Sequence, residues 1–232
     1  MVAIAYSVAF EGIDARLVEV QCSVAAGLPG FAIVGLPDKA VSEARERVKA
    51  AFGALSIAMP NRRLTVNLSP ADLPKEGSHF DLPIALAVLA ALDIVPPDEL
   101  AGVVSLGELA LDGRLVAVAG ALPAAMAAAE DDRTLICPAP CGAEAAWVAS
   151  VPVLAPATLK QALDHLTGRA PLARAKPGEV AAAGMVIAAK GLIRWPELRA
   201  KSEERDEQGR STGIDAVTEY FLVGSFVSWL VA

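Results

Sequence analysis

Apolar and polar residues alternate along the first part of the chain, and this alternation predicts β-strands. From Val18 to Val24 every second residue is apolar and the residues between are polar, the period of two that a strand with one buried face requires. We predict a partner strand at Ala3–Phe10, a third strand at Phe31–Leu36 and a fourth at Leu64–Leu68. The early part of the chain is therefore expected to form a sheet.

Two segments show helical periodicity instead. Asp38 is suited to cap the start of a helix. An apolar stripe with steps of three and four residues follows it, at Val41, Ala44, Val48, Phe52 and Leu55. The segment Leu82–Leu92 is apolar on nearly all sides, so we predict a helix that is mostly buried.

The second half of the chain contains shorter elements. Glu108–Leu111 and Arg114–Val118 flank Asp112-Gly113, and Asp-Gly favours the positive φ angles of a type I′ turn, so a hairpin is predicted here. Five further elements are predicted in the order helix, strand, helix, strand, helix, at Gly120–Ala129, Thr134–Cys137, Ala143–Ala149, Val151–Leu154 and Leu159–Thr167. This mixture of strands and segregated helices indicates an α+β domain over residues 1–168.

The composition changes after Gly168. Arg169–Ala183 mixes Pro, Ala and basic residues like a linker, Lys190–Arg210 is rich in both charge signs, and Tyr220–Ala232 is apolar. We therefore divide the chain into a domain at 1–168 and a linker with an unassigned tail at 169–232. No segment offers the about 20 apolar residues of a membrane-spanning helix, and no basic region precedes the first apolar residues as in a signal peptide. A cytoplasmic protein without membrane contact is expected.

The net charge of −7 argues against a strong nucleic-acid footprint over the whole chain. A local basic patch remains open, and its candidate residues for a DNA or partner contact are Arg45, Arg47, Arg62, Arg63 and Lys75. A solvated helix face is the alternative for Arg45 and Arg47, and an exposed loop position is the alternative for Lys75.

The cysteines and histidines do not predict a metal site. Cys22, Cys137 and Cys141 are an odd number of cysteines, so they do not form a complete set of disulfide pairs. His79 and His165 lie in unrelated segments, so a zinc site is not expected. We predict free thiols that are buried or partly exposed, and no metal or cofactor held by this chain.

One long stretch carries a family resemblance. Residues 67–85 read NLSPADLPKEGSHFDLPIA, and three further stretches agree with the same family, namely GLPGFAIVGLPD at 27–38, Val41–Val48 and Gly107–Arg114. Through these motifs the chain resembles the ComM/YifB family, whose members are often labelled magnesium-chelatase-like. The resemblance covers roughly the first 168 residues.

The resemblance implies a ribosomal-S5-domain-2-like fold related to the Lon peptidase domain, with a mixed sheet and packed helices. It also implies that a linker and an AAA+ ATPase domain follow. The intact relatives are expected to be homohexameric motors that bind DNA, require ATP and Mg²⁺, and drive branch migration during natural transformation and recombination.

The end of the chain departs from the family. The ATPase domain requires a G-x-x-x-x-G-K-[ST] loop, whose backbone amides and lysine hold phosphates. No such run occurs in this sequence, so we expect no nucleotide-binding residue here and no ATP hydrolysis by this chain alone. A frameshift, a misplaced gene end and a lineage-specific truncation would each explain the departure.

Lon-type peptidases use a Ser nucleophile and a Lys base. The resemblance places Asp81 at the nucleophile position and Leu122 at the lysine position, so we expect no catalytic residue. Ser78, His79 and Asp81 offer a triad as an alternative, but residues this close in sequence rarely converge in the relay geometry. We expect instead that His79 bonds to backbone and that Asp81 caps a helix.

Three functions follow from these observations. The first is a non-proteolytic Lon-like module that helps an intact relative to assemble its ring, guide DNA or pass on a partner signal. The second is a free-standing protein-interaction module. The third is a residual Ser/Lys peptidase, against which the missing dyad argues.

Overall fold

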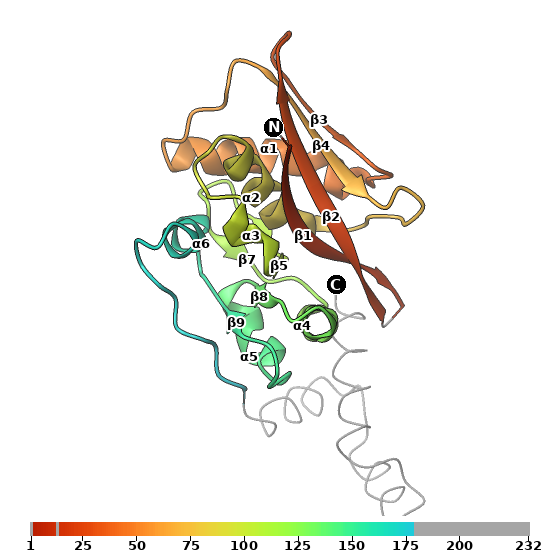
Figure 1. Cartoon of the computed structure of the whole chain (residues 1–232), viewed down its shortest axis with the longest axis vertical. Coiled ribbons are helices and arrows are strands. Elements are labelled where there is room, and N and C mark those ends of the chain that lie inside the picture. The colour runs from red at the N-terminus through yellow and green to blue at the C-terminus, as the bar shows by residue number, and fades with distance from the viewer. Residues whose placement is uncertain (1, 13, 179–232) are drawn as a thin grey trace, which may run out of the picture. The chain divides into compact units, whose positions relative to one another are not determined.

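The computed structural model describes residues 2–12 and 14–178 (Figure 1). The contacts group Met1–Pro177 into one compact unit. The charged segment Lys190–Arg210, the apolar segment Tyr220–Ala232 and the end of the predicted linker lie outside the described residues.

Within these residues the unit is built on a seven-stranded sheet with the order β3-β4-β2-β1-β5-β8-β9, beside a separate β6-β7 hairpin. The strands are β1 (Val2–Glu11), β2 (Asp14–Ala25), β3 (Gly30–Val34), β4 (Arg63–Ser69), β5 (Val103–Ser105), β6 (Glu108–Leu109), β7 (Leu115–Val116), β8 (Thr134–Ile136) and β9 (Val153–Leu154). The helices are α1 (Lys39–Ala54), α2 (Asp81–Ala91), α3 (Asp98–Ala101), α4 (Ala121–Glu130), α5 (Gly142–Ala145) and α6 (Leu159–Leu166), and short 3₁₀ turns lie at Ser78–Phe80 and Ala139–Cys141.

The sheet is mixed. The long strand β2 pairs antiparallel with β1 on one side and with β4 on the other. The pairs β3/β4, β1/β5, β5/β8 and β8/β9 are parallel. The α+β class and the four strands predicted early in the chain are therefore confirmed.

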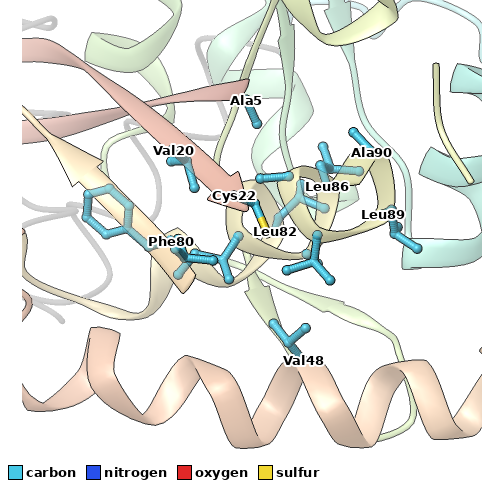
Figure 2. Close-up of a cluster of buried hydrophobic side chains, with 14 of the residues drawn as sticks. Ala5, Val20, Cys22, Val48, Phe80, Leu82, Leu86, Leu89 and Ala90 are labelled. Carbon is cyan, nitrogen blue, oxygen red and sulfur yellow. The ribbon is translucent and has the colours of Figure 1, made fainter. Parts of the chain in front are cut away.

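The main core lies between the sheet and α1, with α2 buried inside it (Figure 2). Every residue of α2 from Asp81 to Ala90 is buried, as the predicted mostly buried helix requires. The apolar stripe of α1 faces the same core, and Asp38 caps that helix by accepting a hydrogen bond from the Val41 amide at 2.7 Å. Both helix predictions are confirmed.

A second core lies on the opposite face of the sheet. Alternate residues of β1 divide between the two cores, because successive side chains of a strand point to opposite faces. Ala5 and Ala9 belong to the main core, whereas Val8 packs in the second core with α4 and α5. The alanine-rich α4 contributes mainly small side chains to this core.

The predicted hairpin is present, but the predicted type I′ turn is wrong. The Ala110 amide donates to the Arg114 carbonyl and the Gly113 amide donates to the Ala110 carbonyl, both at 2.9 Å. Of the three loop residues, Gly113 alone has a positive φ, of 84°. This geometry is a type I turn followed by a left-handed glycine, and the Asp112 carboxylate supports it by accepting from the Arg114 amide at 3.1 Å.

The helix predicted at Ala143–Ala149 is shorter than expected, since α5 ends at Ala145. Residues of the predicted linker also pack on the unit. The Leu172 amide donates to Nδ1 of His165 at 3.0 Å, and the Ala175 amide donates to the Val153 carbonyl at 2.8 Å. The chain between Leu172 and Ala175 therefore covers the outer edge of β9.

Among the helices of the described part, none is both long and apolar enough to cross a membrane.

Candidate functional site

The loop that precedes α2 is tied to the junction between β3 and α1. The Lys75 amide donates to the Leu36 carbonyl at 3.3 Å, and the Lys75 carbonyl accepts from the Asp38 amide at 2.9 Å. The second carboxylate oxygen of Asp38 accepts from the Gly77 amide at 3.2 Å. These bonds place residues 75–81 between the start of α1 and the β6-β7 hairpin.

Lys75 is buried, and the expectation of an exposed loop lysine is wrong. Its side chain is fully enclosed, and its ammonium donates to the Pro70 carbonyl. Burial lowers the pKa of this amine, and Asp72 partly opposes the shift. The amine is turned into the loop, so it is not available as a surface contact for DNA or a partner.

Asp81 holds a bidentate ion pair with Arg47 of α1. Arg47 Nε and Nη2 donate to the two Asp81 oxygens at 2.6 and 2.9 Å, and the Leu109 amide donates to the same carboxylate at 3.0 Å. The Asp81 side chain is 0% exposed and that of Arg47 is 20% exposed. The expectation that Asp81 caps a helix is therefore wrong, because α2 begins at Asp81 itself and the carboxylate is used across the fold.

The environment of this pair shifts both pKa values upward. The hydrogen bond that Arg47 donates to the Asp81 carboxylate raises the pKa of Arg47. Burial raises the pKa of Asp81, while the hydrogen bonds from Arg47 and Leu109 oppose that shift. A buried carboxylate requires such partners, since an isolated buried charge is strongly unfavourable.

The three residues of the alternative triad each have a different partner. Ser78 Oγ donates to Glu108, whereas His79 Nε2 bonds to the Val8 carbonyl at 2.9 Å. The His79 ring packs between Phe10 and Phe80, and burial lowers its pKa to about 4. The expectation that His79 bonds to backbone is confirmed, and the three side chains form no Ser-His-Asp relay.

The residue that the resemblance aligns with the peptidase lysine has a buried apolar side chain. Leu122 lies at the start of α4 and is 5% exposed. A buried isobutyl group and a carboxylate paired with arginine supply neither a base nor a nucleophile. The arrangement around Asp81 is therefore a structural joint between α1, α2 and the hairpin.

The other candidate basic residues remain on the surface but do not form one basic patch with Arg47 and Lys75. Arg45 is paired with Glu46 at 3.4 Å on the exposed side of α1. Arg62 and Arg63 are exposed at the start of β4. Carboxylates therefore neutralise the basic residues of α1, whereas Arg62 and Arg63 lie at the start of β4, at one end of the sheet.

All three cysteines are free and buried. Burial raises the pKa of Cys22 to about 12 and raises the pKa values of Cys137 and Cys141 as well. Thiols with raised pKa values hold little thiolate, the form that reacts and binds metals. Among the described residues, no group of three His, Cys, Asp or Glu side chains is placed to hold a metal ion.

Comparison with known families matches residues 18–140 to the family described as subunit ChlI of Mg-chelatase. The match covers 123 of the 232 residues, more than half of the chain. The chain belongs to this family. The magnesium-chelatase-like resemblance seen in the sequence motifs is therefore confirmed for this ChlI-family chain.

Relatives of the ChlI-family chain include the competence protein ComM of Haemophilus influenzae, which is 42% identical over 167 residues. An uncharacterized protein of Mycobacterium tuberculosis is 44% identical over 170 residues, and the uncharacterized protein YifB of Escherichia coli is 43% identical over 125 residues. The aligned segments cover 72%, 73% and 54% of this chain and 33%, 34% and 25% of the relatives. The ChlI-family chain thus spans about a third or less of each relative's length.

The sequence did not reveal the partners of the residues that it singled out. Arg47 lies 34 positions from Asp81, and Glu108 lies 30 positions from Ser78. One signal was present, because Asp81 directly precedes a fully apolar helix, and a carboxylate that is buried with such a helix needs a cation or hydrogen-bond donors. That signal points to partners for Asp81 without naming the arginine.

Proposed function

We propose that residues 1–168 form a non-proteolytic Lon-like module, of the ribosomal-S5-domain-2-like fold, from a ComM/YifB-type AAA+ ATPase. The observation that carries the proposal is the Arg47–Asp81 ion pair, which joins three elements and involves the residue that the family resemblance aligns with the peptidase nucleophile. In this proposal the Asp81 side chain connects elements of the fold and does not act as a nucleophile. The module then acts through its surface and its rigidity within a larger ATP-driven protein.

The activity that we propose for the whole protein is branch migration of DNA with ATP and Mg²⁺ by a homohexamer in the cytoplasm. The competence protein ComM of Haemophilus influenzae supports this proposal through 42% identity along 167 residues. The G-x-x-x-x-G-K-[ST] loop needed for ATP hydrolysis does not occur in this sequence. We therefore propose the motor activity for a protein that contains the ATPase domain as well as this module.

A domain exchange tests the role of the module. Residues 1–177 replace the matching amino-terminal segment of the Haemophilus influenzae relative, and ATP-dependent movement of a branched DNA junction is measured. We expect the chimera to move the junction much faster than a variant of the relative that lacks its amino-terminal segment, because the exchanged segments are 42% identical. A chimera that folds and hydrolyses ATP but moves DNA no better than that deletion would contradict the proposal, and would favour the free-standing interaction module.

A fluorophosphonate probe tests for residual peptidase chemistry. We expect no labelling of the chain, because the Ser78 hydroxyl donates to the Glu108 carboxylate, whereas a Lon-type nucleophile needs a lysine amine in this position, and no such contact is found among the described residues. An active Lon peptidase provides the positive control. Labelling that disappears in the Ser78→Ala variant would restore the peptidase hypothesis.

A further inference from the structure

No described segment pairs with the outer edge of β3, which is one border of the sheet. Within the described part of the chain, β3 pairs with β4 alone. The Gly30 amide donates to the Arg62 carbonyl at 3.4 Å. Because successive residues of a strand direct their backbone groups to opposite sides, Ala32 and Val34 also face β4, whereas the N–H and C=O groups of Phe31 and Ile33 face outward.

This edge lacks the charges with which natural proteins protect exposed strands. Residues 27–37 read GLPGFAIVGLP and contain no charged side chain. Leu28, Val34 and Leu36 are 88%, 45% and 59% exposed. An apolar edge with free backbone groups is a template for pairing with another strand.

We propose that β3 pairs antiparallel with β3 of a second copy of this chain, with Ala32 at the two-fold axis. In this register Phe31 lies opposite Ile33 of the second copy, and their outward N–H and C=O groups bond to one another at two equivalent places. The register is self-complementary, as a two-fold interface requires. It also joins an aromatic and a β-branched side chain across the new strand pair, a favourable combination.

The same register accounts for the exposed leucines. Leu28 lies two residues before the start of β3 and Leu36 lies two residues after its end. The two-fold axis at Ala32 brings Leu28 of each copy near Leu36 of the other. Both side chains are then buried at the interface, which favours association in proportion to the apolar area buried.

The charges near the β3 edge favour a second copy of this chain as the partner, and they favour antiparallel pairing. The exposed Arg62 and Arg63 lie at the start of the β3-β4 pair, and Asp38 and the exposed Glu76 lie near its other end, where the exposed Lys39 is paired with Glu43 at 3.8 Å. Antiparallel pairing places the basic end of each copy beside the acidic end of the other, whereas parallel pairing would place like charges together. Complementary charges of this kind specify partner and orientation.

The segment that follows β3 is held in a fixed conformation by backbone hydrogen bonds. Leu36 has a φ of 57°, a conformation that costs free energy for a non-glycine residue. Its carbonyl accepts from the Lys75 amide, and the Lys75 carbonyl accepts from the Asp38 amide. These bonds order the segment before association, so less conformational entropy is lost on binding.

Charge-swap variants at the two-fold position test the pairing. The full chain is studied by sedimentation velocity at low salt from micromolar to millimolar concentration, where we expect wild-type dimers. Ala32→Lys and Ala32→Glu each place like charges directly opposite one another, so each variant alone should dimerise at least about tenfold more weakly. An equimolar mixture of the two variants should recover dimers, because the opposed charges are then opposite in sign.

Met126→Lys provides the matched control, since Met126 is 55% exposed on α4 and lies outside β3. This variant should dimerise like the wild type. A wild-type chain that stays monomeric throughout, an Ala32→Lys variant that dimerises normally, or a mixture that fails to recover dimers would each overturn the proposal. Equal loss of dimers in Met126→Lys would overturn it as well.

Discussion

Replacing Arg47 by methionine is expected to lower the free energy of unfolding by about 3–5 kcal/mol, the cost of breaking a buried ion pair. The variant keeps most of the apolar stem of the side chain but leaves the Asp81 carboxylate without its cation. That carboxylate is 0% exposed and retains the Leu109 amide as its other donor. Urea denaturation followed by circular dichroism measures the change.

The effect of Arg47→Met depends on pH with a definite sign. Burial already raises the pKa of Asp81 in the folded protein, and Arg47 opposes that rise. Removing Arg47 raises the pKa further, so the folded variant binds more protons than the unfolded chain and loses stability as pH rises through the folded pKa. The difference from wild type should therefore be smallest in acid and largest near neutral pH.

Two variants control this experiment. Arg45→Met lies on the same helix and removes an exposed arginine that is paired with Glu46, so it should change stability by less than about 0.5 kcal/mol. Asp81→Leu combined with Arg47→Met removes both charges and should recover part of the lost stability. Equal losses in Arg45→Met and Arg47→Met would show that the ion pair is not the cause.

Replacing Gly35 by alanine is expected to destabilise the fold by about 3–5 kcal/mol, since backbone strain and overpacking each cost roughly 1–3 kcal/mol. Gly35 has a φ of 104°, and a Cβ atom there would lie 2.1 Å from the Leu68 carbonyl oxygen. Both the residue and the atom that it meets belong to the backbone of the β3-β4 region, so neither moves easily. Thermal unfolding should show a much lower midpoint.

Gly53→Ala is the matched control and should change stability in the opposite direction. Gly53 lies inside α1, and a Cβ atom there meets nothing within 4 Å. Alanine is favoured over glycine in a helix by roughly 0.5–1 kcal/mol. A Gly35→Ala variant as stable as Gly53→Ala would refute the close approach of β3 and β4 at this position.

The elements of the fold were largely predictable because their signals are local. The alternation around Val20 and the stripe around Val48 follow directly from the periods of a strand and a helix. The turn at Gly113 was harder, because a two-residue and a three-residue loop can both contain Asp-Gly, and the choice depends on which flanking residues pair. Ala110 and Arg114 pair here, which adds one residue to the loop.

The candidate site was less predictable because its contacts join distant parts of the chain. The loop that contains Lys75 has the Pro and Gly content of an exposed segment, yet its backbone bonds to Leu36 and Asp38 draw it inward. A buried Lys75 follows from that pairing, which no local pattern encodes. The partner of Arg47 was not predictable from local pattern either, because the sequence around it predicted a solvated helix face.

The segment between Leu172 and Ala175, which covers β9, determines where the domain can end in a truncated or fused protein. A fragment that ended at Gly168, where the family resemblance stops, would lack the Ala175 amide that bonds to the Val153 carbonyl. Its β9 would then present an open apolar border that invites aggregation. The natural boundary for a fusion or a grafted domain therefore lies after Pro177, where the compact unit ends.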